Sequence, residues 1–312
     1  MKPRLFPSAH TQPLTRQTGR RRTPLICCGS IALALLALSP AGRATSDTWT
    51  GGADALWANT LNWLGGNIPG TGDIATFNSA SANTSLTLGN ITLNTLAFDT
   101  AAAAAYTIGS AADTLTLNAG GAVTVAATVT ASEVIAANVR LGDVAGDQAF
   151  SFTNNSVAGG QTLTFLGVID SATTGTKTLT IGGAGNTIFS SNIDNTAGTI
   201  ALTKTGAGTL TLSGFNSFAG KTTVSAGTLS FNSIGDVGAG GSALGAPTTV
   251  ANGTIDLAGT LLYTGAGSST NRVINLTNAA AGVTINNSGF GALTLTGGIT
   301  GGSTNKIGRA HV

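Results

Sequence analysis

Short alternating segments recur along most of this chain, and they constrain its fold more than any other feature. From Asn83 onward, an aliphatic residue, a small polar residue (usually Thr) and a second aliphatic residue follow one another at many separate places. A period of two puts the aliphatic side chains on one face of a strand and the polar ones on the other. Thr is β-branched and suits a solvated strand face without adding charge. The clearest segments are 86–88, 91–93, 115–117, 123–125, 163–165, 179–181, 210–212, 229–231, 255–257 and 293–295.

The spacing of these segments indicates stacked coils. Gly-Thr-Leu-Thr-Leu at 208–212 returns 19 residues later as Gly-Thr-Leu-Ser-Phe at 227–231, and 26 residues after that as Gly-Thr-Ile-Asp-Leu at 253–257. A recurrence of about 20 to 30 residues lies in the range of solenoid coils. We therefore predict an all-β fold, a right-handed parallel β-helix, with no stable helix at the alanine run 101–105. A β-sandwich is the alternative, but we expect it to carry more aromatic residues between its sheets and less Gly.

Residues 1–44 have the pattern of a secretory signal peptide. A basic stretch ends in Arg20-Arg21-Arg22, an apolar run of 14 residues follows at 25–38, and small residues precede Thr45. A bilayer span needs about 20 apolar residues, so an uncleaved anchor is the weaker alternative. We expect the mature protein to begin near Thr45, with cleavage after Ala41 as the close alternative.

The last six residues, 307–312, differ in character from the Gly/Ser/Thr-rich chain before them. Ile-Gly-Arg-Ala-His-Val is the translation of a common sequencing adapter, ATC GGA AGA GCA CAC GTC, which a TGA stop codon follows. We expect an artefact here and a natural protein that continues, with a natural basic tail as the alternative. The expected organisation is a signal peptide at 1–44, a Trp-rich N-terminal cap at 45–80, β-solenoid repeats at 81–306 and the artefact at 307–312.

Loss of the leader changes the charge and the chemistry of the chain. From Thr45 onward seven cations stand against 12 acids, a net charge of −5 with no basic patch, which excludes a nucleic-acid binder. His10 and both Cys lie in the leader and His311 lies in the suspected artefact, so Thr45 to Asn305 contains no His or Cys. Ser-His-Asp and Cys-His catalysis, His/Cys metal sites and disulfides are therefore excluded in that range.

The acidic residues predict no catalytic centre. Glycoside hydrolysis needs two facing carboxylates, and only Asp143 with Asp147, or Asp236 with Asp256, could be brought together by coiling. Nothing in the sequence places either pair within reach, and Asp beside Gly, Asn or Thr is typical of turns. The nine-residue calcium repeat and the phosphate-binding loop are both missing from the sequence. We predict no catalytic, cofactor-binding or metal-ligating residues and no cofactor.

Trp49, Trp57 and Trp63 are the only tryptophans, and they fall within 15 residues. Flat rings with a polar N–H could stack on sugar rings. A solenoid also needs a cap over its first coil, because a bare end would expose unpaired strand edges. We favour the cap over the sugar platform.

Residues 204–229 resemble the passenger-associated β-strand repeat of bacterial autotransporters. Ser242-Ala-Leu-Gly245 is similar to the short segment that often follows this repeat, and the opening at 48–73 is similar to the start of many such passengers. The resemblance implies a β-helical passenger exported by a Gram-negative cell, with a membrane translocator barrel in the missing C-terminal part. The matching positions are Lys204, Gly206, Gly208, Leu210, Leu212, Gly214, Asn216, Phe218, Gly220, Thr222, Val224, Gly227 and Leu229.

The repeat also has a physical interpretation as scaffold. Its glycines allow tight turns and its Leu and Val residues fill the coil. We expect Asn216 to bond turn backbone, in a ladder where copies stack, and Phe218 to fill the interior. Lys204 is expected to be solvated.

These observations favour a structural protein: a passenger-type stalk or adhesin, secreted or held at the outer membrane surface of a Gram-negative cell. Surface polysaccharide or other cells are the expected partners. The alternative is a fragment of a β-helical carbohydrate-active enzyme, with its catalytic residues in the missing C-terminal part, or a carbohydrate-binding module at 45–80.

Overall fold

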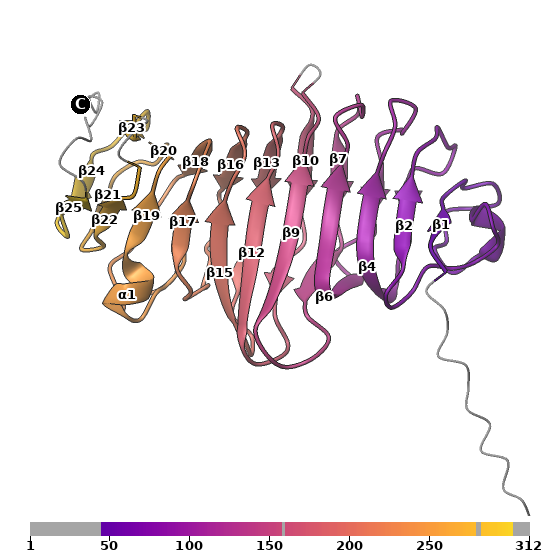
Figure 1. The fold of residues 1–312 in the computed structure, drawn as a ribbon, viewed down its shortest axis with the longest axis horizontal. Coiled ribbons are helices and arrows are strands. Elements are labelled where there is room, and N and C mark those ends of the chain that lie inside the picture. The colour runs from indigo at the N-terminus through magenta and orange to yellow at the C-terminus, as the bar shows by residue number, and fades with distance from the viewer. Residues whose placement is uncertain (1–44, 158–159, 279–281, 302–312) are drawn as a thin grey trace, which may run out of the picture. The chain divides into compact units, whose positions relative to one another are not determined.

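The computed structural model describes residues 45–157, 160–278 and 282–301, and every structural statement below concerns these residues. The predicted signal peptide at 1–44 and the suspected artefact at 307–312 lie outside them. Nearly all regular structure is β-strand, and the strands pair in parallel with strands of the next coil (Figure 1). This arrangement confirms the predicted right-handed parallel β-helix, the right hand being the one that parallel crossovers adopt.

A long sheet runs through the described chain and contains 14 of its strands. Its main path follows the order β1-β2-β4-β6-β9-β12-β15-β17-β19-β22-β25, and β8, β11 and β14 form a branch. These strands are β1 (Asp47–Thr48), β2 (Ile74–Phe77), β4 (Asn90–Phe98), β6 (Thr114–Val125), β8 (Asn138–Leu141), β9 (Gln148–Asn154), β11 (Ile169–Asp170), β12 (Thr176–Gly182), β14 (Ile193–Asp194), β15 (Thr199–Lys204), β17 (Thr222–Val224), β19 (Ile255–Leu257), β22 (Ile274–Leu276) and β25 (Ile299–Gly301).

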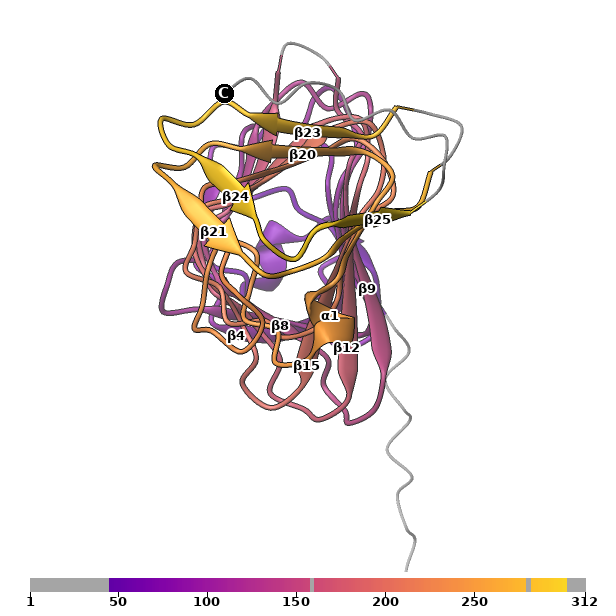
Figure 2. The same cartoon turned by 90° about the vertical axis from the view of Figure 1, so that its left-hand side faces the viewer.

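A second sheet of nine strands forms another side of the described coils. Figure 2 looks along the stack and shows β20 and β23 of this second sheet on a different side from β9, β12 and β15. Its strands are β3 (Ser85–Leu86), β5 (Thr107–Ile108), β7 (Glu133–Ile135), β10 (Thr162–Phe165), β13 (Asn186–Phe189), β16 (Thr209–Leu212), β18 (Thr228–Phe231), β20 (Thr260–Tyr263) and β23 (Thr284–Asn287); a separate pair joins β21 (Ser268–Thr270) to β24 (Leu293–Leu295).

The long sheet forks at β6. Residues 114–117 of this strand pair with β8, whereas residues 122–125 pair with β9. The connections from β8 to β9 and from β11 to β12 therefore turn a corner between the branch and the main path. This corner positions the candidate site described below.

The alternation of Thr and aliphatic residues sets which side chains are inside. In β10, β12 and β16 the Thr residues lie outward and partly exposed, while the Leu, Ile and Phe residues between them are buried. Aromatic rings of successive coils pack against one another in the interior: Phe165 and Phe189 meet edge to face with ring centroids 5.0 Å apart, and the tilted rings of Phe231 and Tyr263 are 5.5 Å apart. Burial of this apolar column against neighbouring coils is the main stabilising term of the fold.

One predicted repeat lies in a different sheet from the one that the sequence spacing suggested. The last three residues of Gly-Thr-Ile-Asp-Leu at 253–257 form β19, which pairs with β17 of the long sheet. The true successor of β18 is β20, and Leu229 pairs with Leu261 there. The segment 232–254 lengthens this coil and shifts the phase of the repeat, so spacing alone matched the wrong strand.

The described helices are both short: a 3-10 turn η1 (Thr60–Asn62) and α1 (Val250–Gly253). No described helix has the length and apolar character needed to cross a membrane. The alanine run 101–105 contains a turn and no helix, and β5 follows it, as expected.

Candidate functional site

The three tryptophans are buried in the N-terminal core. Trp49, Trp57 and Trp63 are 0%, 1% and 3% exposed, and the centroid of Trp63 lies 5.2 Å from that of Trp49 and 4.7 Å from that of Trp57. Each indole N–H donates to a backbone carbonyl: Trp49 to Asn83, Trp57 to Pro69 and Trp63 to Trp57. Rings packed in this way leave no face on which a sugar could stack. The sugar platform considered from the sequence is therefore not formed by these residues.

Lys204 is buried, so the expectation that it is solvated is wrong. Its side chain is 2% exposed, and Nζ donates to the carbonyls of Thr205, Gly206 (2.9 Å) and Ala226 (3.4 Å). Ala226 belongs to the next coil, so the ammonium ties two coils together at the corner after β15. Burial lowers the pKa of Lys204 to about 8.

The other cations are also engaged. Lys177 and Arg272 are buried and, like Lys204, donate to backbone carbonyls. Arg140 forms an ion pair of 2.9 Å with Asp170, and Lys221 forms one of 2.5 Å with Asp256. In the ranges that the structure describes, every Lys or Arg side chain is therefore either buried on carbonyls or paired with an aspartate.

In the two acidic pairs considered from the sequence, the carboxylates accept backbone hydrogen bonds at turns or form an ion pair. Asp147 Oδ1 accepts the backbone N–H of Thr176 at 2.7 Å. Asp236 Oδ1 accepts that of Asn271 at 2.7 Å, whereas Asp256 is held by Lys221 and by the Asn275 amide at 2.8 Å. These separate partners give no sign of a facing carboxylate pair. No group of three or more His, Cys, Asp and Glu side chains in the described ranges could hold a metal ion.

Asn216 and Phe218 lie where the repeat predicts. Asn216 is buried, accepts the Ile193 N–H at 2.7 Å and donates to the Ala243 carbonyl at 2.7 Å, so it bonds backbone on both sides of its own coil. Ala243 lies in Ser242-Ala-Leu-Gly245, the short segment that follows the repeat. Phe218 is completely buried.

Glu133 is a notable residue that the sequence reasoning did not select. It is the only Glu of the chain and is fully buried, with Oε2 accepting the Tyr106 N–H at 2.9 Å and Oε1 without a hydrogen-bond partner. Burial raises the pKa of Glu133 to about 7 and, together with the Glu133 charge, raises that of Tyr106 to about 12. The sequence could have predicted this burial, because Glu133 lies two residues before Ile135 in β7 and therefore faces the same side of the strand, which is the interior.

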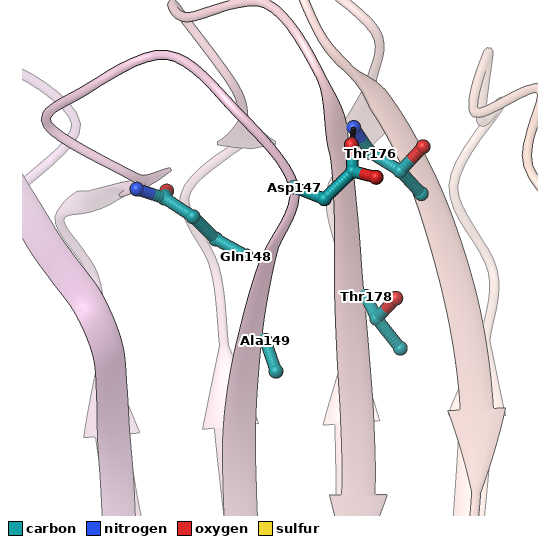
Figure 3. A pocket seen from close by; sticks show the side chains of 5 residues that line it. All are labelled: Asp147, Gln148, Ala149, Thr176 and Thr178. Carbon is teal, nitrogen blue, oxygen red and sulfur yellow. Dashed lines mark hydrogen bonds between the residues drawn. The ribbon is translucent and has the colours of Figure 1, made fainter.

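A hollow of about 370 Å³ lies at the forked corner of the long sheet. Figure 3 shows the side chains of Asp147, Thr176 and Thr178 on neighbouring segments, with Ala149 as a small side chain beside them and Gln148 directed toward the adjacent loop. Asp147 Oδ1 is used by the Thr176 N–H, and no further hydrogen bond of this carboxylate is formed in the described residues. The lining of the hollow combines a carboxylate oxygen and two Thr side chains with the apolar side chain of Ala149.

A row of hydroxyl side chains leads away from this hollow across the long sheet. Register pairs Ser151 with Thr180, Thr180 with Thr203 and Thr203 with Thr223, so four successive strands present one hydroxyl each. All four are partly exposed. The row ends at Asp256, which pairs with Thr223 in the sheet and carries the Lys221 ion pair.

Comparison with known proteins identifies the type of chain. The family model described as passenger-associated-transport-repeat matches residues 202–231, which run from the middle of β15 to the end of β18. The adhesin BmaC autotransporter of Brucella suis biovar 1 (strain 1330) is 30% identical over 311 residues, covering 85% of this chain. The chain is an autotransporter passenger. It spans only 9% of the length of that relative, and no solved structure matches it. The buried Lys204 and Asn216 of the passenger are therefore residues of its matched repeat, where they join adjacent coils.

Proposed function

We propose that this passenger acts at the surface of a Gram-negative cell as an adhesin-type segment without enzymatic activity. The observation that carries the proposal is the similarity to an autotransporter adhesin over 85% of the chain. Because the relative is much longer, we propose that this chain contributes to adhesion as one segment of a larger adhesive surface. The Thr-lined outer face of strands such as β12 supports a contact surface, and the acids Asp147 and Asp236 are used by turn backbone in the described residues.

Within that role, the stacked coils serve as a stalk as well as a contact surface. Each coil is fixed to the next by backbone pairing and by buried groups such as Lys204 and Asn216. A segment built in this way holds its faces in a constant register.

Surface display is tested on intact cells that express the gene. Antibody raised against residues 45–301 should label unbroken cells, and added protease should remove the label while a cytoplasmic marker survives. Deletion of the gene should lower attachment to surfaces or to other cells, and a plasmid copy should restore it. Labelling that requires cell lysis would contradict the proposal.

A further inference from the structure

We propose that the outer face of the long sheet from β9 to β17 binds a neutral, extended polysaccharide, and that the hollow beside Asp147 receives one of its sugar residues. The inference rests on the proposed surface role, which it makes specific by naming a site and a ligand class. The site consists of the hollow and the hydroxyl row Ser151, Thr180, Thr203 and Thr223.

Charge selects the class of ligand. The described cations are either buried on carbonyls or, as with Arg140 and Lys221, already paired with an aspartate, so no unpaired cation is present to attract a phosphate, sulfate or carboxylate. Exposed acids such as Asp143 and Asp147 would repel a polyanion. A neutral ligand would meet no electrostatic repulsion from these acids.

The hydroxyl row supplies regularly spaced polar contacts. Neighbouring strands lie about 4.8 Å apart, so four in-register hydroxyls extend over about 14 Å. The hydroxyls of Thr180, Thr203 and Thr223 form no side-chain hydrogen bond within the described residues, whereas corner residues such as Thr205 and Ser213 bond to the preceding coil. A hydroxyl can both donate and accept, which suits the many hydroxyl groups of a sugar chain.

The hollow adds a stronger polar anchor at one end of the row. Because Asp147 uses Oδ1 for the Thr176 N–H, its carboxylate is held in place while Oδ2 remains free of protein partners. A charged acceptor forms a stronger hydrogen bond to a sugar hydroxyl than a neutral one does. Ala149 leaves room beside this oxygen, in an open hollow of about 370 Å³.

Strand β12 connects the hollow to the hydroxyl row. Thr178 lines the hollow, and Thr180 follows it on the same face of β12. One strand therefore contributes both to the hollow and to the hydroxyl row. A sugar chain that crosses the strands can occupy the two parts together.

The test uses the purified full chain and insoluble microcrystalline cellulose, a neutral chain of extended sugars, with soluble hydroxyethyl cellulose in affinity electrophoresis as a second probe. Alginate, a polyanion, is the comparison ligand. We expect binding to the neutral glucans that persists at 0.5 M NaCl, and none to alginate. Absence of binding to both neutral glucans, or binding to alginate that salt abolishes, would overturn the inference.

Two double variants locate the site. Thr178→Val with Thr180→Val removes hydroxyls on the long sheet, and Thr209→Val with Thr211→Val removes the same number on the second sheet. Val keeps the β-branched shape, so both should fold like the parent protein in circular dichroism and thermal melting. The first should weaken glucan binding about tenfold, as expected for two lost hydrogen bonds, and the second should leave it unchanged. Equal loss in both variants would contradict the assignment to the long sheet.

Asp147→Asn tests the anchor separately, because the Asn side-chain oxygen can still accept the Thr176 N–H. We expect weaker glucan binding at unchanged melting temperature, and full binding by this variant would remove Asp147 from the site. Binding by purified protein does not depend on display. A displayed chain that binds no glucan contradicts this inference alone, whereas a glucan-binding chain that never reaches the surface contradicts the proposed function alone.

Discussion

The carboxylate of Glu133 accepts the backbone N–H of Tyr106 at 2.9 Å, which joins β7 to the coil before it in the interior of the solenoid. The second oxygen of Glu133 is buried without a partner. Tyr106 in turn packs against Phe77 at 4.8 Å and donates its hydroxyl to the Ser79 carbonyl at 2.7 Å. The Glu133 carboxyl is thus one polar link, beside the backbone pairing of β5 with β7, between the solenoid body and the aromatic core of the N-terminal coils.

This link predicts a stability that falls as the pH rises. Burial raises the pKa of Glu133 from 4.5 to about 7, so between these values the unfolded chain loses a proton that the folded chain retains. The contribution is complete below about pH 4.5, decreases up to pH 7 and is lost above it, a change on the order of 3 kcal/mol. Glu133→Gln should remove this dependence and raise the urea midpoint at pH 8. The exposed-site variant Asp143→Asn should behave like the parent, and an identical pH profile for Glu133→Gln would contradict the prediction.

Lys204 predicts the opposite pH dependence. Its pKa is lowered from 10.5 to about 8, so the folded protein binds fewer protons than the unfolded chain between these values and stability should rise with pH there. Lys204→Met should abolish that rise. The same variant should lower stability at pH 7 by about 1 to 3 kcal/mol, because it leaves buried carbonyls such as that of Gly206 without a donor. Denaturant unfolding measures both effects. Lys221→Met, which removes a partly exposed ion pair, should cost about 0 to 1 kcal/mol.

Glycines at one corner stack so closely that a methyl group cannot be added. Gly206 has a φ of +67°, and a Cβ there would lie 2.3 Å from the Gly183 carbonyl oxygen of the preceding coil. Gly206→Ala should therefore destabilise by more than about 1 kcal/mol, through both backbone strain and collision. Gly240→Ala is the matched control, since a Cβ there meets nothing within 4 Å. We expect Gly206→Ala to melt at a lower temperature than Gly240→Ala. Similar melting temperatures for the two variants would contradict the close packing inferred at Gly206.

Which strand side chains are buried and which face solvent could be predicted, because the alternation of apolar and polar residues in the sequence matches the alternation of the two faces of a strand. Leu210 and Leu212 are buried and Thr211 between them is not, as the period of two requires. The burial of Phe218, which lies outside the strands, was expected instead from its place in the repeat. Such local patterns need no knowledge of which coil lies next to which.

Features that depend on register between coils could not be predicted. Lys204 resembles an ordinary solvated cation until the carbonyl of Ala226 is brought to it by the following coil. The coils also differ in length, so the alignment of Thr180 with Thr203 and Thr223 cannot be obtained from any fixed repeat. The long segment 232–254 is the extreme case, because it moved Gly-Thr-Ile-Asp-Leu onto the other sheet.

Arg272 fixes that long segment to the solenoid, and its replacement should release it. The side chain is 1% exposed, with Nε donating to the Gly253 carbonyl at 2.7 Å and Nη1 to the Leu244 carbonyl at 2.6 Å. Both acceptors lie in 232–254, and a guanidinium can reach the two at once because its donors form a fixed fork, whereas an ammonium is a single point. Arg272→Lys should therefore keep the charge and lose one of the two bonds.

Limited digestion with thermolysin measures the release, because Val250 in this segment is 67% exposed and offers a cleavage point once the backbone loosens. We expect cleavage before Val250 to be faster in Arg272→Lys than in the parent protein by about tenfold, since local opening is governed by the contacts that hold a segment. Arg140→Lys is the control, because its ion pair with Asp170 lies on a different part of the solenoid and is partly exposed. Equal cleavage rates in the parent and Arg272→Lys would show that the Leu244 and Gly253 carbonyls do not depend on the guanidinium to stay in place.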